Sequence, residues 1–150
     1  TLLVGTNFRR DQDGEGLNAL LNYGYTVLRS ATARAVVAAG LHRSIGLHHS
    51  NDGNAMRLVD DLLEPFRPIV DLKVWQLQRA GEVQVTPETK RALVRTLYDD
   101  MQSSVGATPV MVCMQKLAVS LAQVYLGERD KLDLPLPGLP LALAGSLDSD

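Results

Sequence analysis

The residues best suited to chemistry in this chain of 150 residues lie in the stretch 40–71. It contains all histidines of the protein and, after a polar loop, a cluster of acids: His42, His48, His49, Asp60, Asp61 and Glu64. One imidazole with one or two carboxylates forms a hard, oxygen-rich ligand set that suits Mg²⁺ or Mn²⁺. Such an ion supports phosphoryl transfer because it activates a water or hydroxyl and neutralises charge on the phosphate.

Each histidine taken alone has an ordinary explanation as a core or surface residue. His42 lies beside Arg43 at the end of a predicted helix, and we interpret it as structural. Adjacent loop residues usually point apart, so we expect one of His48 and His49 to be a ligand rather than both.

The acids also allow two interpretations. Asp60 and Glu64 are four residues apart and Asp61 and Glu64 are three apart, so either pair can share a helical face. In the ordinary interpretation this face is solvated and balanced by Arg57 and Arg67. In the functional interpretation the carboxylates bind a metal ion, and the second of these arginines clamps a phosphate through two N–H donors.

Hydrophobic spacing predicts an all-α fold whose helices must position these residues. The expected segments are a polar linker at 1–16, an all-α lobe at 17–133 with helices at 17–39, 54–64, 68–78, 86–104 and 108–126, and a proline-rich tail at 134–150. Gly24 lies inside the first helix, where close approach of another backbone would explain it. Pro65 is expected to break the helix at Glu64. Thr86 and Pro87 form a helix start signal.

Composition excludes several classes of protein. The net charge of -2 gives no global basic field, so any DNA contact must come from local patches or from a partner chain. A single cysteine excludes an internal disulfide framework and a cysteine zinc site, which fits a cytoplasmic protein. We find no secretory signal, no membrane span, and no glycine-rich phosphate loop, nucleophile elbow or HExxH motif. The chain begins at Thr1, and its first four residues look like the end of an element, so we expect a part to precede it.

Three blocks of sequence carry a family resemblance. They are NALLNYGYTVLRSATARAVVAAGLH (Asn18–His42), SIGLHHSNDGNAMRLVDDLLEPFRPIVD (Ser44–Asp71) and TPETK from Thr86. Together they resemble the CRISPR spacer-acquisition integrase of type II systems, over most of residues 8–126. That family has an N-terminal β-domain and a C-terminal all-α catalytic lobe, and the resemblance implies that this chain corresponds to the lobe.

The resemblance also implies a metal site. In the family a glutamate, a histidine and a later acid hold the ion. The histidine falls on His49 and the acid on Glu64, with Asp61 as a neighbouring acid that assists. The first glutamate of the family would lie before Thr1, and Glu15 does not match it. The chain is therefore expected to be weak or inactive alone.

By resemblance, the parent protein inserts captured DNA fragments into a CRISPR array by transesterification, with Mg²⁺ or Mn²⁺ held by His49 and Glu64. Arg67, Arg57 and Arg10 would hold phosphates of double-stranded DNA, a role independent of base sequence. The implied partners are a second copy of the chain in a homodimer, a small ferredoxin-like CRISPR adaptation protein and type II effector proteins.

Two other interpretations remain open from the sequence. The chain could be a non-catalytic helical module, a truncated or degenerate copy that only binds DNA or dimerises. It could also be an unrelated all-α metallohydrolase, which is supported only by the sparse metal motif.

Overall fold

The computed structural model describes the backbone of residues 2–41 and 52–135 and the side chains of residues 13–41 and 57–135. Helices make up most of these residues, which confirms the predicted all-α class, and the strands form one small two-stranded sheet. The elements are α1 (Leu2–Ala38), α3 (Asp52–Leu63), η1 (Glu64–Phe66), α4 (Arg67–Arg79), α5 (Pro87–Arg95), η2 (Thr96–Tyr98), β1 (Asp100–Ser103), β2 (Gly106–Pro109) and α6 (Val110–Tyr125). The predicted tail lies outside the described residues from position 136 onward.

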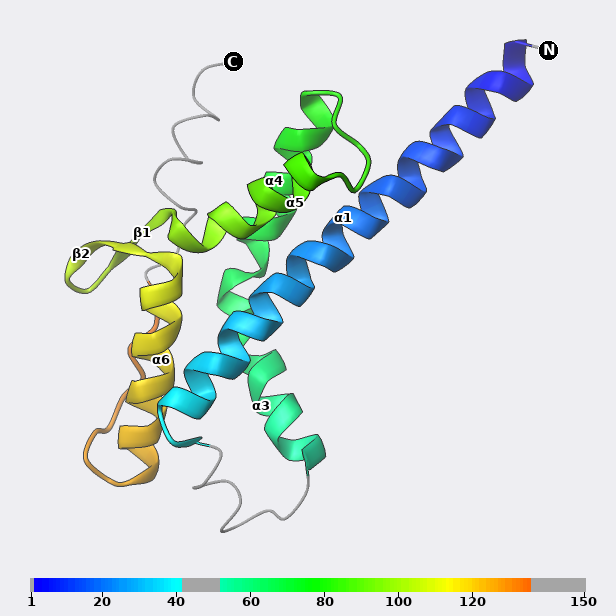
Figure 1. Ribbon diagram of the computed structural model, residues 1–150. Helices are drawn as coiled ribbons and strands as arrows, with labels where there is room; N and C mark the ends of the chain where they lie inside the picture. Colours follow the sequence, from blue (N-terminus) through cyan, green and yellow to red (C-terminus); the bar gives the residue numbers. More distant parts are fainter. Residues whose placement is uncertain (1, 42–51, 136–150) are drawn as a thin grey trace.

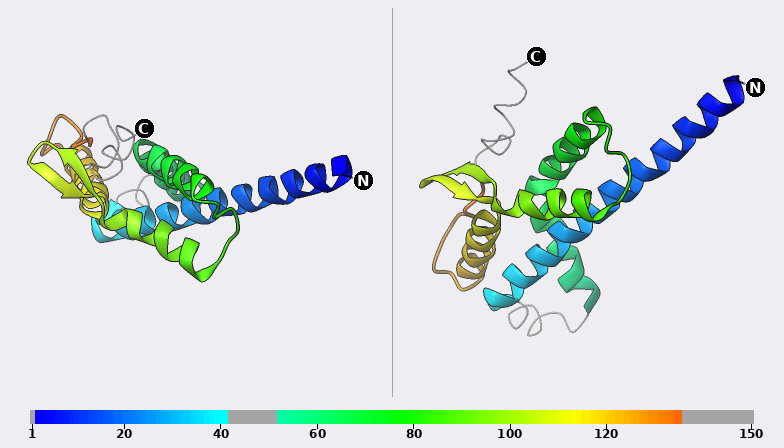
Figure 2. Two further views of the ribbon diagram at one scale, coloured as in Figure 1. Left: turned by 90° about the horizontal axis from the view of Figure 1, so that it is seen from above. Right: turned by 45° about the horizontal axis from the view of Figure 1, so that its top comes forward.

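Helix α1 is the central element of the fold. Helices α3, α4, α5 and α6 all pack against it (Figure 1). Its N-terminal part projects beyond these helices in each view (Figure 2). The structure corrects the linker predicted at 1–16, because residues 2–16 are continuous with the helix. Arginine, glutamine and glutamate in this segment are good helix formers, and it contains no proline.

The buried side of α1 is a row of residues spaced four apart. The row consists of Gly16, Leu20, Gly24, Leu28, Thr32 and Val36. Residues spaced in this way form an inclined ridge along which neighbouring helices pack. Thr32 is tolerated in the row because its hydroxyl donates a hydrogen bond of 2.8 Å to the carbonyl oxygen of Leu28. The row is therefore defined by small size and satisfied hydrogen bonds as much as by hydrophobicity.

Two glycines of this row mark close approaches of other elements. A Cβ atom at Gly24 would lie 2.5 Å from Cγ1 of Val70 in α4. The neighbour at this glycine is thus a side chain, and not the backbone that we expected. The close backbone approach occurs at Gly16, where a Cβ atom would overlap the carbonyl oxygen of Val83.

The predicted helix break at Pro65 is confirmed. Helix α3 ends at Leu63, and Glu64 opens the 3₁₀ turn η1, in which Arg67 donates its backbone N–H to the carbonyl oxygen of Glu64. Proline cannot donate such a bond and restricts the residue before it. Phe66 is fully buried and fixes the turn against the core.

The predicted start of α5 is also confirmed. The hydroxyl of Thr86 accepts a hydrogen bond of 3.2 Å from the backbone N–H of Thr89, and Pro87 occupies the first helical position. The hydroxyl of Thr89 in turn accepts a bond of 2.8 Å from the backbone N–H of Thr86, which completes a capping box.

The helices predicted at 86–104 and 108–126 are both too long, because residues 96–109 form a 3₁₀ turn and a hairpin instead. After α5 and η2 the chain forms a hairpin in which Met101 of β1 lies opposite Thr108 of β2. The hydroxyls of Ser103 and Thr108 lie 2.8 Å apart and are buried, and Gly106 has a φ angle of 105°. Serine, threonine and glycine are poor helix formers, and this φ angle is one that glycine adopts readily. Helix α6 consequently begins at Val110.

The hydrophobic core lies between α1 and the helices around it. Trp75 lies outside this core: it is 38% exposed, and the guanidinium of Arg79 lies over its ring, 5.0 Å from the ring centroid. In the part of the chain that the structure describes, no helix combines the length and the apolar character needed to cross a lipid bilayer.

The packing of α1 predicts opposite effects for alanine at two of its glycines. Gly24→Ala should destabilise the chain by about 1–3 kcal/mol, because the added methyl group would collide with Val70. Gly14→Ala is the matched control, since a Cβ atom there meets nothing within 4 Å, and it should stabilise the chain by up to about 1 kcal/mol. Urea unfolding followed by circular dichroism measures both changes. Equal stability of the two variants would contradict the packing described here.

Candidate functional site

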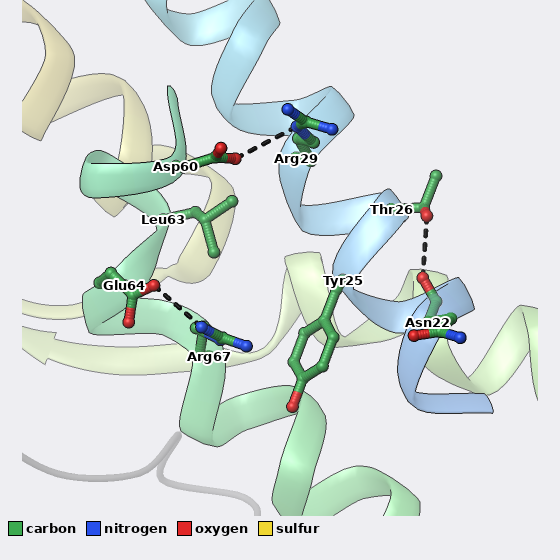
Figure 3. A pocket seen from close by; sticks show the side chains of 8 residues that line it. All are labelled: Asn22, Tyr25, Thr26, Arg29, Asp60, Leu63, Glu64 and Arg67. Carbon is green, nitrogen blue, oxygen red and sulfur yellow. Dashed lines mark hydrogen bonds and ion pairs between the residues drawn. The ribbon is translucent and has the colours of Figure 1, made fainter. Parts of the chain in front are cut away.

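An open groove of about 510 Å³ lies between α1 and the segment formed by α3, η1 and α4 (Figure 3). Its lining residues are Asn22, Tyr25, Thr26, Arg29, Asp60, Leu63, Glu64 and Arg67. The first four belong to α1, where the spacing of three and four places them on one face. The others come from the C-terminal end of α3 and the beginnings of η1 and α4. The groove is therefore polar, with charges of both signs.

Glu64 sits at the helix break, where its side chain is 56% exposed. One of its carboxylate oxygens, Oε1, accepts a hydrogen bond of 3.0 Å from Nη1 of Arg67. This hydrogen bond and the negative charge of Glu64 raise the pKa of the Arg67 guanidinium further above its usual value. The carboxylate that the sequence analysis assigned to metal binding is thus paired with the arginine that it assigned to a phosphate.

Arg67 has a second contact on the other side of the groove. Its guanidinium lies over the ring of Tyr25, with Cζ 4.8 Å from the ring centroid. The hydroxyl of Tyr25 donates a hydrogen bond to Oδ1 of Asp71, one turn further along α4. Partial burial, this hydrogen bond and the charge of Asp71 raise the pKa of the Tyr25 phenol above 10.0. The phenol is therefore a neutral donor at neutral pH.

A separate ion pair also crosses the groove. Nε of Arg29 in α1 lies 3.2 Å from Oδ1 of Asp60 in α3. Both side chains are about half exposed, so the pair contributes at most about 1 kcal/mol to stability. Its main effect is electrostatic, because the positive charge of Arg29 offsets the negative charge of Asp60.

The structure brings together two of the residues that the sequence singled out, Glu64 and Arg67. Asp61 and Arg57 are exposed on α3 and do not line the groove. Arg10 lies in the N-terminal part of α1, where the backbone alone is described, and His49 lies outside the described residues. The roles predicted for Asp61, Arg57, Arg10 and His49 therefore remain predictions.

The described side chains do not form a complete metal site. Within residues 13–41 and 57–135, no three histidine, cysteine, aspartate or glutamate side chains gather closely enough to hold an ion. The carboxylate of Glu64 is nevertheless a hard oxygen donor of the kind that Mg²⁺ and Mn²⁺ prefer, and it faces an open groove. One carboxylate does not form a metal site by itself, so metal binding at Glu64 remains a prediction.

The sequence analysis missed the α1 side of the groove. It assigned no role to the groove residues Asn22, Tyr25, Thr26 and Arg29. Their spacing along one helical face was a visible signal, but the same face could equally have been solvated. The partners of Tyr25 are Arg67 and Asp71, which are 42 and 46 positions further along the chain, and local sequence patterns do not reveal contacts over such separations.

A comparison with protein families identifies the chain. Residues 7–100 match the family model described as CRISPR associated protein Cas1, and this region contains α3, η1, α4, α5 and almost all of α1. The chain belongs to the Cas1 family. Every residue that lines the groove lies within the matched region. The resemblance noted in the sequence is thereby confirmed at the level of the family.

Individual Cas1 proteins show the same relationship. The chain is 35% identical over 142 residues to a CRISPR-associated endonuclease Cas1 of Neisseria meningitidis serogroup C, which covers 93% of this chain and 46% of that protein. It is 40% identical over 117 residues to a CRISPR-associated endonuclease Cas1 of Pyrobaculum aerophilum, covering 78% of this chain and 38% of the relative. The chain therefore spans less than half the length of these two Cas1 relatives.

The Tyr25–Asp71 hydrogen bond predicts an unusual ionisation. In an alkaline titration followed by phenolate absorbance, one of the four tyrosines should ionise above the ordinary range. Because the folded pKa exceeds the unfolded one, the associated stability is complete below the unfolded pKa and is lost as pH rises through the folded pKa. Tyr25→Phe should remove the late step, and Tyr23→Phe, two residues away, should retain it. A late step that persists in Tyr25→Phe would assign the shift to another residue.

Proposed function

We propose that this chain supplies the helical part of a metal-dependent DNA endonuclease and integrase that inserts foreign DNA fragments into a CRISPR array. Two findings support this proposal. The chain belongs to the Cas1 family, and the similar proteins are named CRISPR-associated endonucleases. The observation that carries the proposal is the pair formed by Glu64 and Arg67 at an open groove, because it joins a hard metal donor to a phosphate-binding cation.

The proposed reaction is a transesterification of DNA. The 3′-hydroxyl of the captured fragment attacks a phosphodiester of the array, a new P–O bond forms, and the bond to the existing 3′-oxygen breaks. The proton of the attacking hydroxyl passes to solvent or a nearby base, and the leaving oxygen is protonated. One phosphodiester replaces another, so no external energy source is required.

In this proposal His49 and Glu64 hold Mg²⁺ or Mn²⁺, and Asp61 assists. When bound, such an ion would supply a Lewis acid that activates the attacking oxygen and offsets charge on the phosphate. Arg67 has five N–H donors, one of which is used by Glu64, so its guanidinium can also meet a phosphate at the groove. Arg57 and Arg10 would hold phosphates further along the DNA without reading its sequence.

The proposed context is that of CRISPR adaptation in the cytoplasm. The active form would be a homodimer that acts on double-stranded DNA together with a small ferredoxin-like adaptation protein, and type II effector proteins would help to choose fragments. A different function, that of a non-catalytic module that binds DNA or dimerises, is the outcome to be separated from this proposal by experiment.

Metal binding by Glu64 is tested by titration calorimetry with Mn²⁺ on the 150-residue chain. Glu64→Gln should weaken binding by at least about tenfold, because the variant replaces a charged donor with a neutral amide of equal size. Asp60→Asn is the matched control. Asp60 is a second carboxylate of the same groove that the proposal does not assign as a ligand, so this variant should bind Mn²⁺ as the unsubstituted chain does. Equal binding by the Glu64→Gln variant would remove Glu64 from the metal site.

Catalysis is tested on the complete product of the reading frame that encodes this chain. Strand transfer of a labelled DNA fragment into a repeat-containing plasmid should require Mg²⁺ or Mn²⁺. His49→Ala and Glu64→Gln should each reduce it by about 10³-fold or more while helix content, measured by circular dichroism, is unchanged. DNA binding without any transfer by the unsubstituted protein would instead support the non-catalytic module.

A further inference from the structure

Four side chains form one connected chain of contacts across the groove. The carboxylate of Glu64 binds Arg67, the guanidinium of Arg67 lies over the ring of Tyr25, and the hydroxyl of Tyr25 binds Asp71. We propose that Tyr25 is a positioning residue, which holds Arg67 at the wall of the groove where the guanidinium orients Glu64 and meets a phosphate of DNA. This inference rests on the proposed function, because it assigns a support to residues that the function uses.

The need for a support follows from the chemistry of arginine. Its side chain is long and has many rotamers, so fixing the charged end costs conformational entropy. At Arg67 the side chain is 45% exposed, and the ion pair with Glu64 alone would be weakened by water and salt. The ring of Tyr25 adds a second contact, from α1, which restricts the positions that the guanidinium can take.

The contacts of Arg67 leave part of its hydrogen-bonding capacity for a further ligand. A guanidinium carries five N–H donors. Arg67 uses Nη1 for Glu64, and its side chain is 45% exposed in a groove that is open to solvent. A phosphate that enters the groove can therefore bind Arg67 without displacing either Glu64 or Tyr25.

Asp71 fixes the tyrosine in turn. Tyr25 belongs to α1, whereas Arg67 and Asp71 both belong to α4, so the hydrogen bond to Asp71 holds the ring against the helix that carries the arginine. The phenol is neutral at neutral pH and donates to Asp71, and its raised pKa extends this state to more alkaline pH. The ring orientation is thus set by a bond that is independent of Glu64.

Two other cations in the described part of the chain lie over aromatic rings. Arg79 lies 5.0 Å from the ring centroid of Trp75, and Lys90 lies 5.6 Å from that of Tyr23. None of these residues lines the groove. The pair formed by Arg67 and Tyr25 differs because a carboxylate of the candidate site is bonded to the same guanidinium. The Arg79–Trp75 pair, which is also on α4, is therefore a suitable control.

The experiment is a double-mutant cycle on DNA binding by the full 150-residue chain. Fluorescence anisotropy with a labelled duplex of arbitrary sequence is measured at several NaCl concentrations for Tyr25→Leu, Arg67→Ala and the double variant. Loss of one phosphate contact reduces the slope of log K against log salt by about 1. Each single variant should show this reduction and several-fold weaker binding. The double variant should be no weaker than Arg67→Ala, because Tyr25 acts through Arg67.

Two further variants separate positioning from general stability. Tyr25→Phe keeps the ring but loses the hydrogen bond to Asp71, so its DNA affinity should lie between those of the unsubstituted chain and Tyr25→Leu. Trp75→Leu removes a ring under an arginine elsewhere on α4 and should leave the coupling between positions 25 and 67 unchanged. Urea unfolding confirms that each variant is folded under the conditions of the binding assay.

The inference would be overturned if the losses of DNA-binding free energy in Tyr25→Leu and Arg67→Ala added up in the double variant, since Tyr25 would then act independently of Arg67. Unchanged salt dependence in Arg67→Ala would remove the phosphate contact and overturn the inference with it. Failure of the proposed metal chemistry is recognised separately, because Mn²⁺ binding by Glu64→Gln is measured without DNA.

Discussion

Close packing along one side of α1 is the constraint on which the rest of the structure depends. Four helices share this helix as a neighbour, and they reach it along a row in which small residues alternate with larger ones. At Gly24 the side chain of Val70 occupies the space where a Cβ atom would be. The position of α4 relative to α1 is therefore set by the absence of a side chain, since any larger residue would push the two helices apart.

The same contact determines the groove. Tyr25 follows Gly24 directly, and it reaches Arg67 and Asp71 because Val70 brings α4 against α1 at that level. The break at Pro65 acts from the other side, because it ends α3 and places Glu64 at the start of a new turn. Residues that pack the helices together are thus next in sequence to residues that line the groove, as Gly24 is to Tyr25.

Much of this organisation could be predicted from the sequence. Helix start signals such as Thr86 and the break at Pro65 are local effects of hydrogen bonding and backbone geometry, and they were predicted correctly. The hairpin after η2 was missed, because strand pairing depends on contacts that local patterns do not show. In the site, Glu64 and Arg67 were identified by type and spacing. Tyr25 was not, because its role depends on a partner in another helix.

The continuous helix from Leu2 has a mechanical consequence. With a rise of 1.5 Å per residue, the segment between Leu2 and Gly16 is roughly 21 Å long, and its outer turns extend beyond the other helices (Figure 2). An α-helix of this length behaves as a stiff rod, so a tilt of about 5° at the contact with Val83 would move its far end by about 2 Å. A force applied to that end would act as a torque, with the contact at Gly16 as the pivot.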